Sequence, residues 1–262
     1  MRAISFSLYG SGRLYVAGMA VNCHLAPRVY GPGWVVRIHH DDTVPRQALD
    51  YYASLPSVQL VDHTGDGLTD GQRMLWRFYD MDPQYGYTEM LSRDADSRTY
   101  LREKVAVDEW LGTDALAHSI RDSISHRCLD LCGGLCGFRC IFPDVAANIR
   151  RWLGVTPSRP MYGWDQEWLK QAILPIISES IMYHGRDGAL SCYPAELTVP
   201  YDGWTDDAGN HHEGYHCGAL DPPRTQAEIK EFGVDKLIEY CDGNMGGFKG
   251  GPLDTGQTPS AT

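Results

Sequence analysis

The chain has 262 residues, of which 43% are hydrophobic, and a formal net charge of −11 at pH 7. This length suits one large α/β domain with a substantial buried core, or two small domains. The acidic balance argues against a nucleic-acid partner, because binding to phosphate backbones needs clustered Lys and Arg. No run of about 18 apolar residues occurs in the sequence, so a membrane span is not expected.

The first quarter of the chain alternates between strand and helix patterns. Strands are predicted over 3–9, 34–40 and 58–61, with helices over 14–26 and 46–55 between them. This alternation is typical of a parallel sheet with right-handed crossovers. The first strand ends at Tyr9 and Gly10. Ligands of open α/β sheets lie beyond the carboxyl ends of the strands, so we expect both residues to face a nucleotide.

A capped amphipathic helix is predicted over residues 69–79. Arg73 and Arg77 lie four residues apart on one face of this helix. Two interpretations of the pair are open. The arginines either form a solvated face or contact a diphosphate.

Two carboxylates, one residue apart, follow the next apolar run. Asp94 and Asp96 stand in Arg-Asp-Ala-Asp-Ser-Arg, bracketed by Arg93, Arg98 and Arg102. Carboxylates at this spacing can share Mg²⁺ or Mn²⁺, which prefer oxygen ligands and accept water or phosphate oxygens in the remaining positions. Arginines beside such a metal would bind phosphate or sugar oxygens. The alternative is a solvated turn in which short acidic side chains cap their own backbone.

The acidic string resembles the Asp-X-Asp segment of A-type (GT-A fold) glycosyltransferases, in particular the small enzymes of large algal viruses and of some bacteria and phages. The resemblance covers residues 3–185. It implies a single GT-A-like α/β domain with a central, mostly parallel sheet flanked by helices. It also implies Mn²⁺ or Mg²⁺, a UDP- or GDP-linked sugar donor, and a glycan or glycoprotein acceptor. A Trp-Arg-Phe-like string precedes the Asp-X-Asp strand in these enzymes, which favours Arg77 as a donor ligand, together with Arg93, Asp94 and Arg98.

Two further strings are similar to this family. The string Arg-Asp-X-X-X-His is formed by Arg121, Asp122 and His126. The loop Gly-Gly-X-X-Gly begins at Gly133 and Gly134 and is followed by Arg139. Glycines let a sugar ring approach main-chain amides without a Cβ in the way, so Gly133 and Gly134 are predicted donor contacts and Arg139 a donor or acceptor contact. A plain glycine turn is the alternative.

Within residues 162–177 a helix is predicted to begin at Asp165, its N-cap. In the resembled family an Asp-Gln pair opens a helix near the reacting sugar carbon. This implies a catalytic or acceptor-orienting role for Asp165, whose carboxylate could take the acceptor hydroxyl proton as a general base. Capping is the simpler interpretation of the same residue.

A third metal ligand is expected from the C-terminal part, because A-type transferases often add a histidine to the two acidic ligands. His184 is the first choice and His216 the alternative. A lone histidine is more often a surface or core residue without a ligand.

Residues 212–216 match the zinc-protease pattern His-Glu-X-X-His. That chemistry needs a helix, so that both imidazoles share one face. Gly214 and the surrounding residues make a stable helix improbable. Two alternative functions stay open: a zinc-dependent hydrolase using His212, Glu213 and His216, and a non-catalytic carbohydrate-binding protein.

The remaining patterns concern organisation. Four cysteines, Cys128, Cys132, Cys136 and Cys140, are interpreted as buried thiols rather than a zinc site. A last helix is predicted over 225–240, before a flexible tail over 242–262. We expect one domain over 1–241, with a nucleotide-binding half (1–100) and an acceptor half (101–241). No signal-peptide core precedes the first strand, so a cytoplasmic location is expected, in a bacterial or virus-infected cell.

Overall fold

The computed structural model describes residues 1–121, 126, 129–156, 163–185, 204–205, 211–212 and 222–241. A seven-stranded sheet in the order β3-β2-β1-β4-β6-β5-β7 runs through its centre. The strands are β1 (Arg2–Leu8), β2 (Trp34–His40), β3 (Val58–Asp62), β4 (Glu89–Arg93), β5 (Ala117–Ile120), β6 (Leu135–Arg139) and β7 (Ile181–His184). Only β6 pairs antiparallel with its neighbours in this sheet. The predicted mostly parallel sheet is therefore confirmed.

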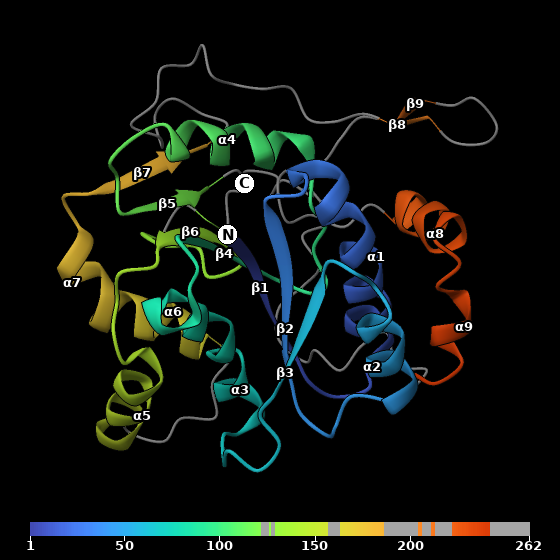
Figure 1. Ribbon diagram of the computed structural model, residues 1–262, viewed down its shortest axis with the longest axis horizontal. Helices are drawn as coiled ribbons and strands as arrows, with labels where there is room; N and C mark the ends of the chain where they lie inside the picture. Colours follow the sequence, from blue (N-terminus) through green and yellow to red (C-terminus); the bar gives the residue numbers. More distant parts are fainter. Residues whose placement is uncertain are drawn as a thin grey trace, which may run out of the picture.

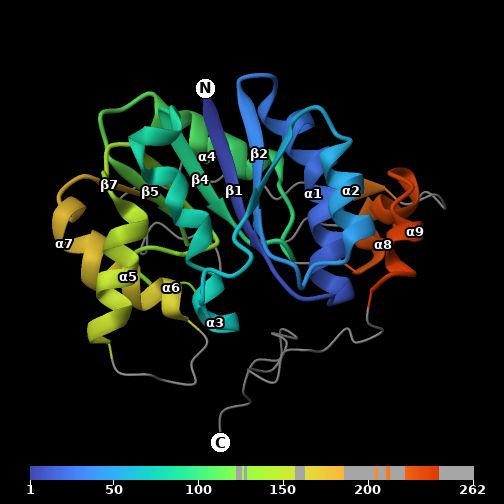
Figure 2. The same ribbon diagram turned by 60° about the horizontal axis from the view of Figure 1, so that its bottom comes forward.

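Helices cover both faces of the sheet (Figures 1 and 2). One hydrophobic core lies beneath α1 (Arg13–Tyr30), α2 (Arg46–Ala53), α4 (Leu101–Leu111), α8 (Pro222–Glu231) and α9 (Asp235–Ile238). A second core lies beneath the 3-10 helix η1 (Trp76–Met81), α5 (Val145–Val155), α6 (Trp164–Trp168) and α7 (Leu174–Ile177), with a π-helical turn (Leu169–Ile173) before α7. The predicted flanking helices are thus present on both sides.

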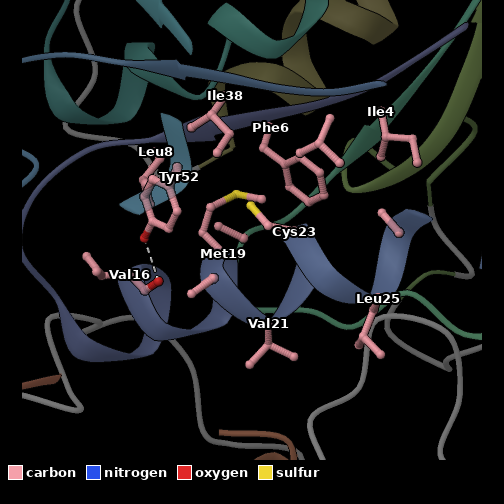
Figure 3. Close-up of a cluster of buried hydrophobic side chains, with 14 of the residues drawn as sticks. Ile4, Phe6, Leu8, Val16, Met19, Val21, Cys23, Leu25, Ile38 and Tyr52 are labelled. Carbon is pink, nitrogen blue, oxygen red and sulfur yellow. Dashed lines mark hydrogen bonds between the residues drawn. The ribbon is translucent and has the colours of Figure 1, made fainter. Parts of the chain in front are cut away.

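Strand β1 alternates large apolar residues with serines, and the two kinds of residue face opposite sides of the sheet. Successive strand residues point to opposite faces. Ile4, Phe6 and Leu8 pack against α1 and α2 (Figure 3). On the other face, Ser5 donates a hydrogen bond to Asp80 at 2.8 Å, and Ser7 donates one to the Met74 carbonyl at 3.2 Å. These small residues let the segment that contains η1 lie directly on the sheet.

The helix predicted over 69–79 is wrong in its extent. It begins as predicted, with a capping box between Thr69 and Gln72, but α3 (Asp70–Arg73) ends after one turn. Every residue of the following η1 is buried, including Asp80, which accepts hydrogen bonds from strand residues Arg37 and His39. A segment buried on all sides does not have the single apolar face that an amphipathic α-helix needs.

The order of the strands creates a switch point at β1. The chain runs from β1 to β2 and β3 on one side, and then returns to place β4 on the other side of β1. Ligands of open α/β sheets bind at the carboxyl ends of the strands at such a point. Because β6 is antiparallel to β4, with Leu135 opposite Arg93, the residues that precede β6 lie at this same edge.

Several organisational predictions can be compared with the fold. Cys132, Cys136 and Cys140 are buried free thiols, whereas Cys128 lies outside the described residues. Helices α8 and α9 lie against α1 (Figure 1), although the predicted division assigns them to the acceptor half. The tail over 242–262 is outside the described residues. Within the described chain, no helix has both the length and the apolar character needed to cross a membrane.

Candidate functional site

Arg77 joins two carboxylates at the switch point. Its side chain is only 4% exposed. One terminal nitrogen, Nη1, donates to the Asp94 carboxylate and to the Arg93 carbonyl, and Nη2 donates to Asp165 Oδ2 at 2.5 Å. Three parts of the chain that are far apart in sequence, η1, the end of β4 and α6, therefore meet at one guanidinium.

The two acidic residues form a partly exposed turn after β4. The Asp94 side chain is 47% exposed, and Asp96 is also partly exposed. The backbone N–H and the hydroxyl of Ser97 both donate to the Asp94 carbonyl, at 3.2 and 2.9 Å, and close the turn. Burial and then the neighbouring Asp94 carboxylate raise the pKa of Asp96 to about 6. Two carboxylates thus stand together at the edge of the sheet.

Gly133 and Gly134 lie against the carboxylates of Asp165 and Asp94, respectively. A Cβ at Gly134 would stand 1.9 Å from Asp94 Oδ2, and one at Gly133 would stand 2.2 Å from Asp165 Oδ2. The sequence explained the glycines by access for a sugar ring. The structure adds a different requirement, because a side chain at either position would displace a carboxylate. Their predicted contact with a donor stays a prediction.

Gln166 and Ser92 hold the glycine pair in place, and the sequence did not assign either of them this role. Ser92 Oγ donates to the Gly133 carbonyl at 2.5 Å. The Gln166 amide, turned to satisfy both neighbours, accepts from the Gly133 N–H at 2.7 Å and donates to the Leu131 carbonyl at 2.6 Å. The serine could have been suspected from its place next to Arg93 and Asp94, on a strand that ends at the site.

Asp165 does not cap its helix, so the capping interpretation is wrong. Gly163, with a φ of 93°, is the N-cap of α6, and Asp165 is the second residue of the helix. Its side chain is buried and bonded to Arg77. Burial raises the pKa of Asp165, and the charge of Arg77 acts in the opposite direction. The buried pair with Arg77, rather than the helix end, fixes this carboxylate.

Tyr9 and Gly10 stand at the carboxyl end of β1, as predicted. Burial raises the pKa of Tyr9 to about 12, and the charges of Arg77 and Asp165 act on the same hydroxyl. Gly10 has a φ of 74° and donates its backbone N–H to Thr43 Oγ1 at 2.7 Å. The left-handed backbone at Gly10 therefore ties the end of β1 to the end of β2.

Arg73 and Arg77, the pair left open by the sequence, have different partners. Arg73 forms ion pairs with Asp41 at 3.1 Å and with Asp70 at 2.9 Å. Asp41 follows β2 and is 3% exposed. The break between α3 and η1 separates the two arginines, and only Arg77 contacts Asp94 and Asp165.

Arg93 and Arg98 are held in other ion pairs. Arg93 Nε donates to Glu103 Oε1 at 2.7 Å, and Arg98 Nε donates to Glu228 Oε2 at 3.2 Å. The alternation along β4 explains the first case, because Arg93 points to the face covered by α4 and Asp94 does not. Both guanidinium groups are 1% exposed. Their predicted role as donor ligands stays a prediction, and we leave them out of the candidate site.

His184 does not join the acidic pair. Its Nε2 lies 3.6 Å from Glu109 Oε2, and its ring meets His118 edge-on at 5.6 Å. Over the part of the chain that the structure describes, no group of three or more His, Cys, Asp and Glu side chains could hold a metal ion. The alternative ligand His216 lies outside the described residues, as does Asp122.

The expectation for Arg139 is wrong. Arg139 ends β6 opposite Glu89, at the start of β4, and donates to the Glu89 carboxylate at 2.5 Å and to the Thr113 carbonyl at 2.7 Å. The antiparallel direction of β6 places its beginning at the candidate site and its end at the opposite edge of the sheet. Spacing along the sequence could not distinguish these two edges.

Comparison with known proteins gives structural likeness only. No family model and no curated protein matches the chain. Among solved structures, the galactosyltransferase LgtC in complex with donor and acceptor sugar analogs matches at 11% identity and a TM-score of 0.47, over 92% of this chain and 96% of that one. A glycosyltransferase involved in glycosylation of the major capsid of PBCV-1 matches at 9% identity and a TM-score of 0.47, over 89% and 98%.

A third match, to S. aureus TarS, has 12% identity and a TM-score of 0.38 over 63% of this chain, and spans about half of that protein (52%). Two of these three solved structures are glycosyltransferases, and the likeness to them is structural. At these identities and TM-scores it does not establish a function, which depends on the geometry of the site.

Proposed function

We propose that this protein is a glycosyltransferase that moves a sugar from a nucleoside-diphosphate donor to a hydroxyl acceptor, with Mn²⁺ or Mg²⁺ at Asp94 and Asp96. One observation carries the proposal. Arg77 bridges Asp94 and Asp165 at the switch point of a mostly parallel sheet, and two glycines make room for both carboxylates. This arrangement places a cation-binding turn, a fixed positive charge and a buried acid at one ligand-binding edge.

The donor's diphosphate would lie beside the acidic turn, on the exposed side of the Asp94 carboxylate that Arg77 contacts. Arg77 Nε is buried and has no hydrogen-bond partner among the described residues, and the positive charge of Arg77 lies beside the accessible Asp94 carboxylate. Bond cleavage leaves additional negative charge on the departing nucleoside diphosphate. A buried guanidinium held by two carboxylates is already oriented to stabilise that charge.

The donor set of the acidic turn fits an oxygen-preferring cation. Asp94 and Asp96 are both partly exposed, and both offer carboxylate oxygens. Mg²⁺ is commonly bound by one or two carboxylates with water and substrate phosphates in the other positions. A bound cation would neutralise the diphosphate and act as a Lewis acid toward the leaving group. A third protein ligand is not required for this arrangement.

Asp165 would act on the sugar side of the site. Its carboxylate is buried and one oxygen is bonded to Arg77, which keeps the group in a single orientation. A carboxylate in this position can accept a hydrogen bond from a sugar hydroxyl and hold the reacting sugar in place. We propose this orienting role for Asp165, in contact with the donor or acceptor.

The zinc-hydrolase alternative is less compatible with the fold. His212, its first expected ligand, lies in β9 (His211–His212), which pairs antiparallel with β8 (Trp204–Thr205). The motif needs both histidines on one helical face, and an extended first histidine does not provide this. Glu213 and His216 lie outside the described residues.

Thermal unfolding with UDP, GDP, CDP and dTDP, each with and without Mn²⁺, tests the proposal. We expect one nucleotide to stabilise the protein only with Mn²⁺, by about 2.7 kcal/mol at roughly 100 times its Kd. The same nucleotide should not stabilise Asp96→Asn. Asp50→Asn is the matched control, because Asp50 is an exposed carboxylate on α2 that pairs with Arg46.

The corresponding sugar nucleotide should then release its nucleoside diphosphate when a hydroxyl acceptor is supplied. Absence of stabilisation by all four nucleotides, with Mn²⁺ present, would contradict the proposal. Loss of activity in Glu213→Gln with full activity in Asp96→Asn would support the zinc hydrolase instead. A non-catalytic carbohydrate-binding protein would bind a glycan and leave every sugar nucleotide intact.

A further inference from the structure

The backbone of the acidic turn, Asp94–Ser97, is in close contact with helix α1. A Cβ on Gly18 would lie 2.3 Å from the Ala95 carbonyl oxygen, so only glycine allows this approach. One turn further along α1, Asn22 Nδ2 donates to the Ser97 carbonyl at 2.9 Å and to the Ala95 carbonyl at 3.4 Å. Helix α1 therefore fixes the turn from one side, by contacting the backbone carbonyl groups of the turn.

Arg98 fixes the same turn from a second direction. Its Nη1 donates to the Ser97 carbonyl at 2.8 Å and to the Asp96 carbonyl at 3.4 Å. Its Nε donates to Glu228 Oε2 at 3.2 Å, across 130 residues of sequence. The two side chains are 1% and 7% exposed. A buried guanidinium thus connects the backbone of the acidic turn to a carboxylate on α8.

Helix α8 has its own attachment to α1. The Arg28 guanidinium lies 4.5 Å from the centre of the Phe232 ring. His24 also stacks on the Phe232 ring, with the two ring centroids 4.8 Å apart. Ile229 adds a buried apolar contact. These contacts hold α8 against α1, and Glu228 on α8 accepts the hydrogen bond from Arg98.

We propose that Glu228 is a positioning residue for the cation site, acting through Arg98 on the turn that carries Asp94 and Asp96. This inference rests on the proposed function. Two physical effects support it. Glu228 keeps the buried Arg98 neutralised, and a buried charge that loses its partner must find another one. Arg98 Nη1 lies 3.4 Å from the Asp96 carbonyl oxygen, so an unpaired Arg98 would compete with a cation for the carboxylate of the same residue.

Binding of Mn²⁺ to the metal-free protein, measured by the electron paramagnetic resonance signal of unbound Mn²⁺, tests this role. Glu228→Gln keeps a hydrogen-bond acceptor but removes the charge, and we expect it to weaken Mn²⁺ binding about tenfold, as for other residues behind metal ligands. Glu228→Asp, which keeps the charge, should recover part of the affinity. Glu231→Gln is the matched control on the same helix, because Glu231 and its partner Arg28 are both more than half exposed, and a surface ion pair contributes little to holding the helix.

Two further readouts separate positioning from a general loss of stability. Amide hydrogen exchange in residues 95–98 of the metal-free protein should be faster in Glu228→Gln than in Glu231→Gln. In the transferase assay, the Mn²⁺ concentration for half-maximal turnover should rise, with kcat at saturating Mn²⁺ retained. A merely unstable variant would instead lose kcat in proportion to its unfolded fraction.

Equal Mn²⁺ affinity in Glu228→Gln and Glu231→Gln, with normal binding by the unmutated protein, would overturn the positioning role and leave the proposed function standing. Unchanged exchange in residues 95–98 would also overturn it. If the unmutated protein binds neither Mn²⁺ nor a nucleotide, the proposed function fails, and the positioning role fails with it.

Discussion

Arg77 and Arg93 are both buried arginines that bind carboxylates beside β4, but their surroundings differ. The partner of Arg93, Glu103, is 1% exposed and also accepts a hydrogen bond from Tyr30. One partner of Arg77, Asp94, is 47% exposed at the carboxyl edge of the sheet. The first cluster, formed by residues of β4, α1 and α4, is buried, whereas the second includes an accessible carboxylate.

This difference indicates how an ion pair that stabilises the fold can be distinguished from an ion pair at a ligand-binding site. Burial of the arginine does not distinguish them. The exposure of the carboxylate does, because a ligand or cation must reach an oxygen that the protein has left accessible. The comparison predicts that changes at Arg93 mainly affect the free energy of unfolding, whereas changes at Arg77 mainly affect binding and turnover.

The largest expected effect is on stability. Arg93→Met leaves Glu103 buried without a cation, and we expect the free energy of unfolding to fall by about 3–5 kcal/mol. The double variant Arg93→Met/Glu103→Gln removes both charges and keeps an acceptor for the Tyr30 hydroxyl, so it should recover much of the loss. Urea unfolding measures both variants. A double variant no more stable than the single one would show that charge pairing is not the cause.

The next effect should be on turnover. Arg77→Lys keeps a positive charge but cannot bridge Asp94 and Asp165, and we expect kcat/KM for the sugar nucleotide to fall about 100-fold. Arg46→Lys changes an exposed arginine paired with Asp50 on α2 and should leave the rate unchanged. Release of nucleoside diphosphate is the measurement. A wild-type rate in Arg77→Lys would contradict the distinction between the two arginines.

The smallest effect concerns the glycine loop. Gly134→Ala places a methyl group against Asp94, so Mn²⁺-dependent nucleotide binding should weaken about tenfold. Gly154→Ala is a matched control, since a Cβ at Gly154 in α5 meets open space and should stabilise that helix by at most about 1 kcal/mol. Titration calorimetry with the preferred nucleotide compares them. Equal affinities would mean that the turn accommodates the methyl group without moving Asp94.

Local patterns in the sequence predicted much of the fold. The alternating strands and helices up to β3 agree with the structure, and the apolar run before the acidic pair forms β4, which ends at Arg93. These features depend on the spacing of apolar residues over a few turns or pleats, which a single sequence displays directly. The prediction of a helix over 69–79 was wrong because η1 is buried on all sides. The spacing of apolar residues indicates a helix only when one face of it is buried.

The candidate site was predicted less completely. The motifs named Arg77, Asp94, Gly133, Gly134 and Asp165, and the structure brings these five together, although their roles in binding and catalysis stay predictions. The motifs did not identify Asp41, Ser92 or Glu228, whose positions follow from contacts between distant segments.

The sequence by itself determined which chemical groups are available and which strands and helices carry them. The tertiary structure alone decided which arginine meets which carboxylate. Arg77 contacts Asp165, which is 88 residues away in sequence, and Arg98 contacts Glu228, which is 130 residues away. The direction of β6 places Arg139 at the edge of the sheet opposite to Gly133 and Gly134. The physical reason is that strand order, strand direction and the two faces of a strand are set by packing between distant segments, which local periodicity does not encode.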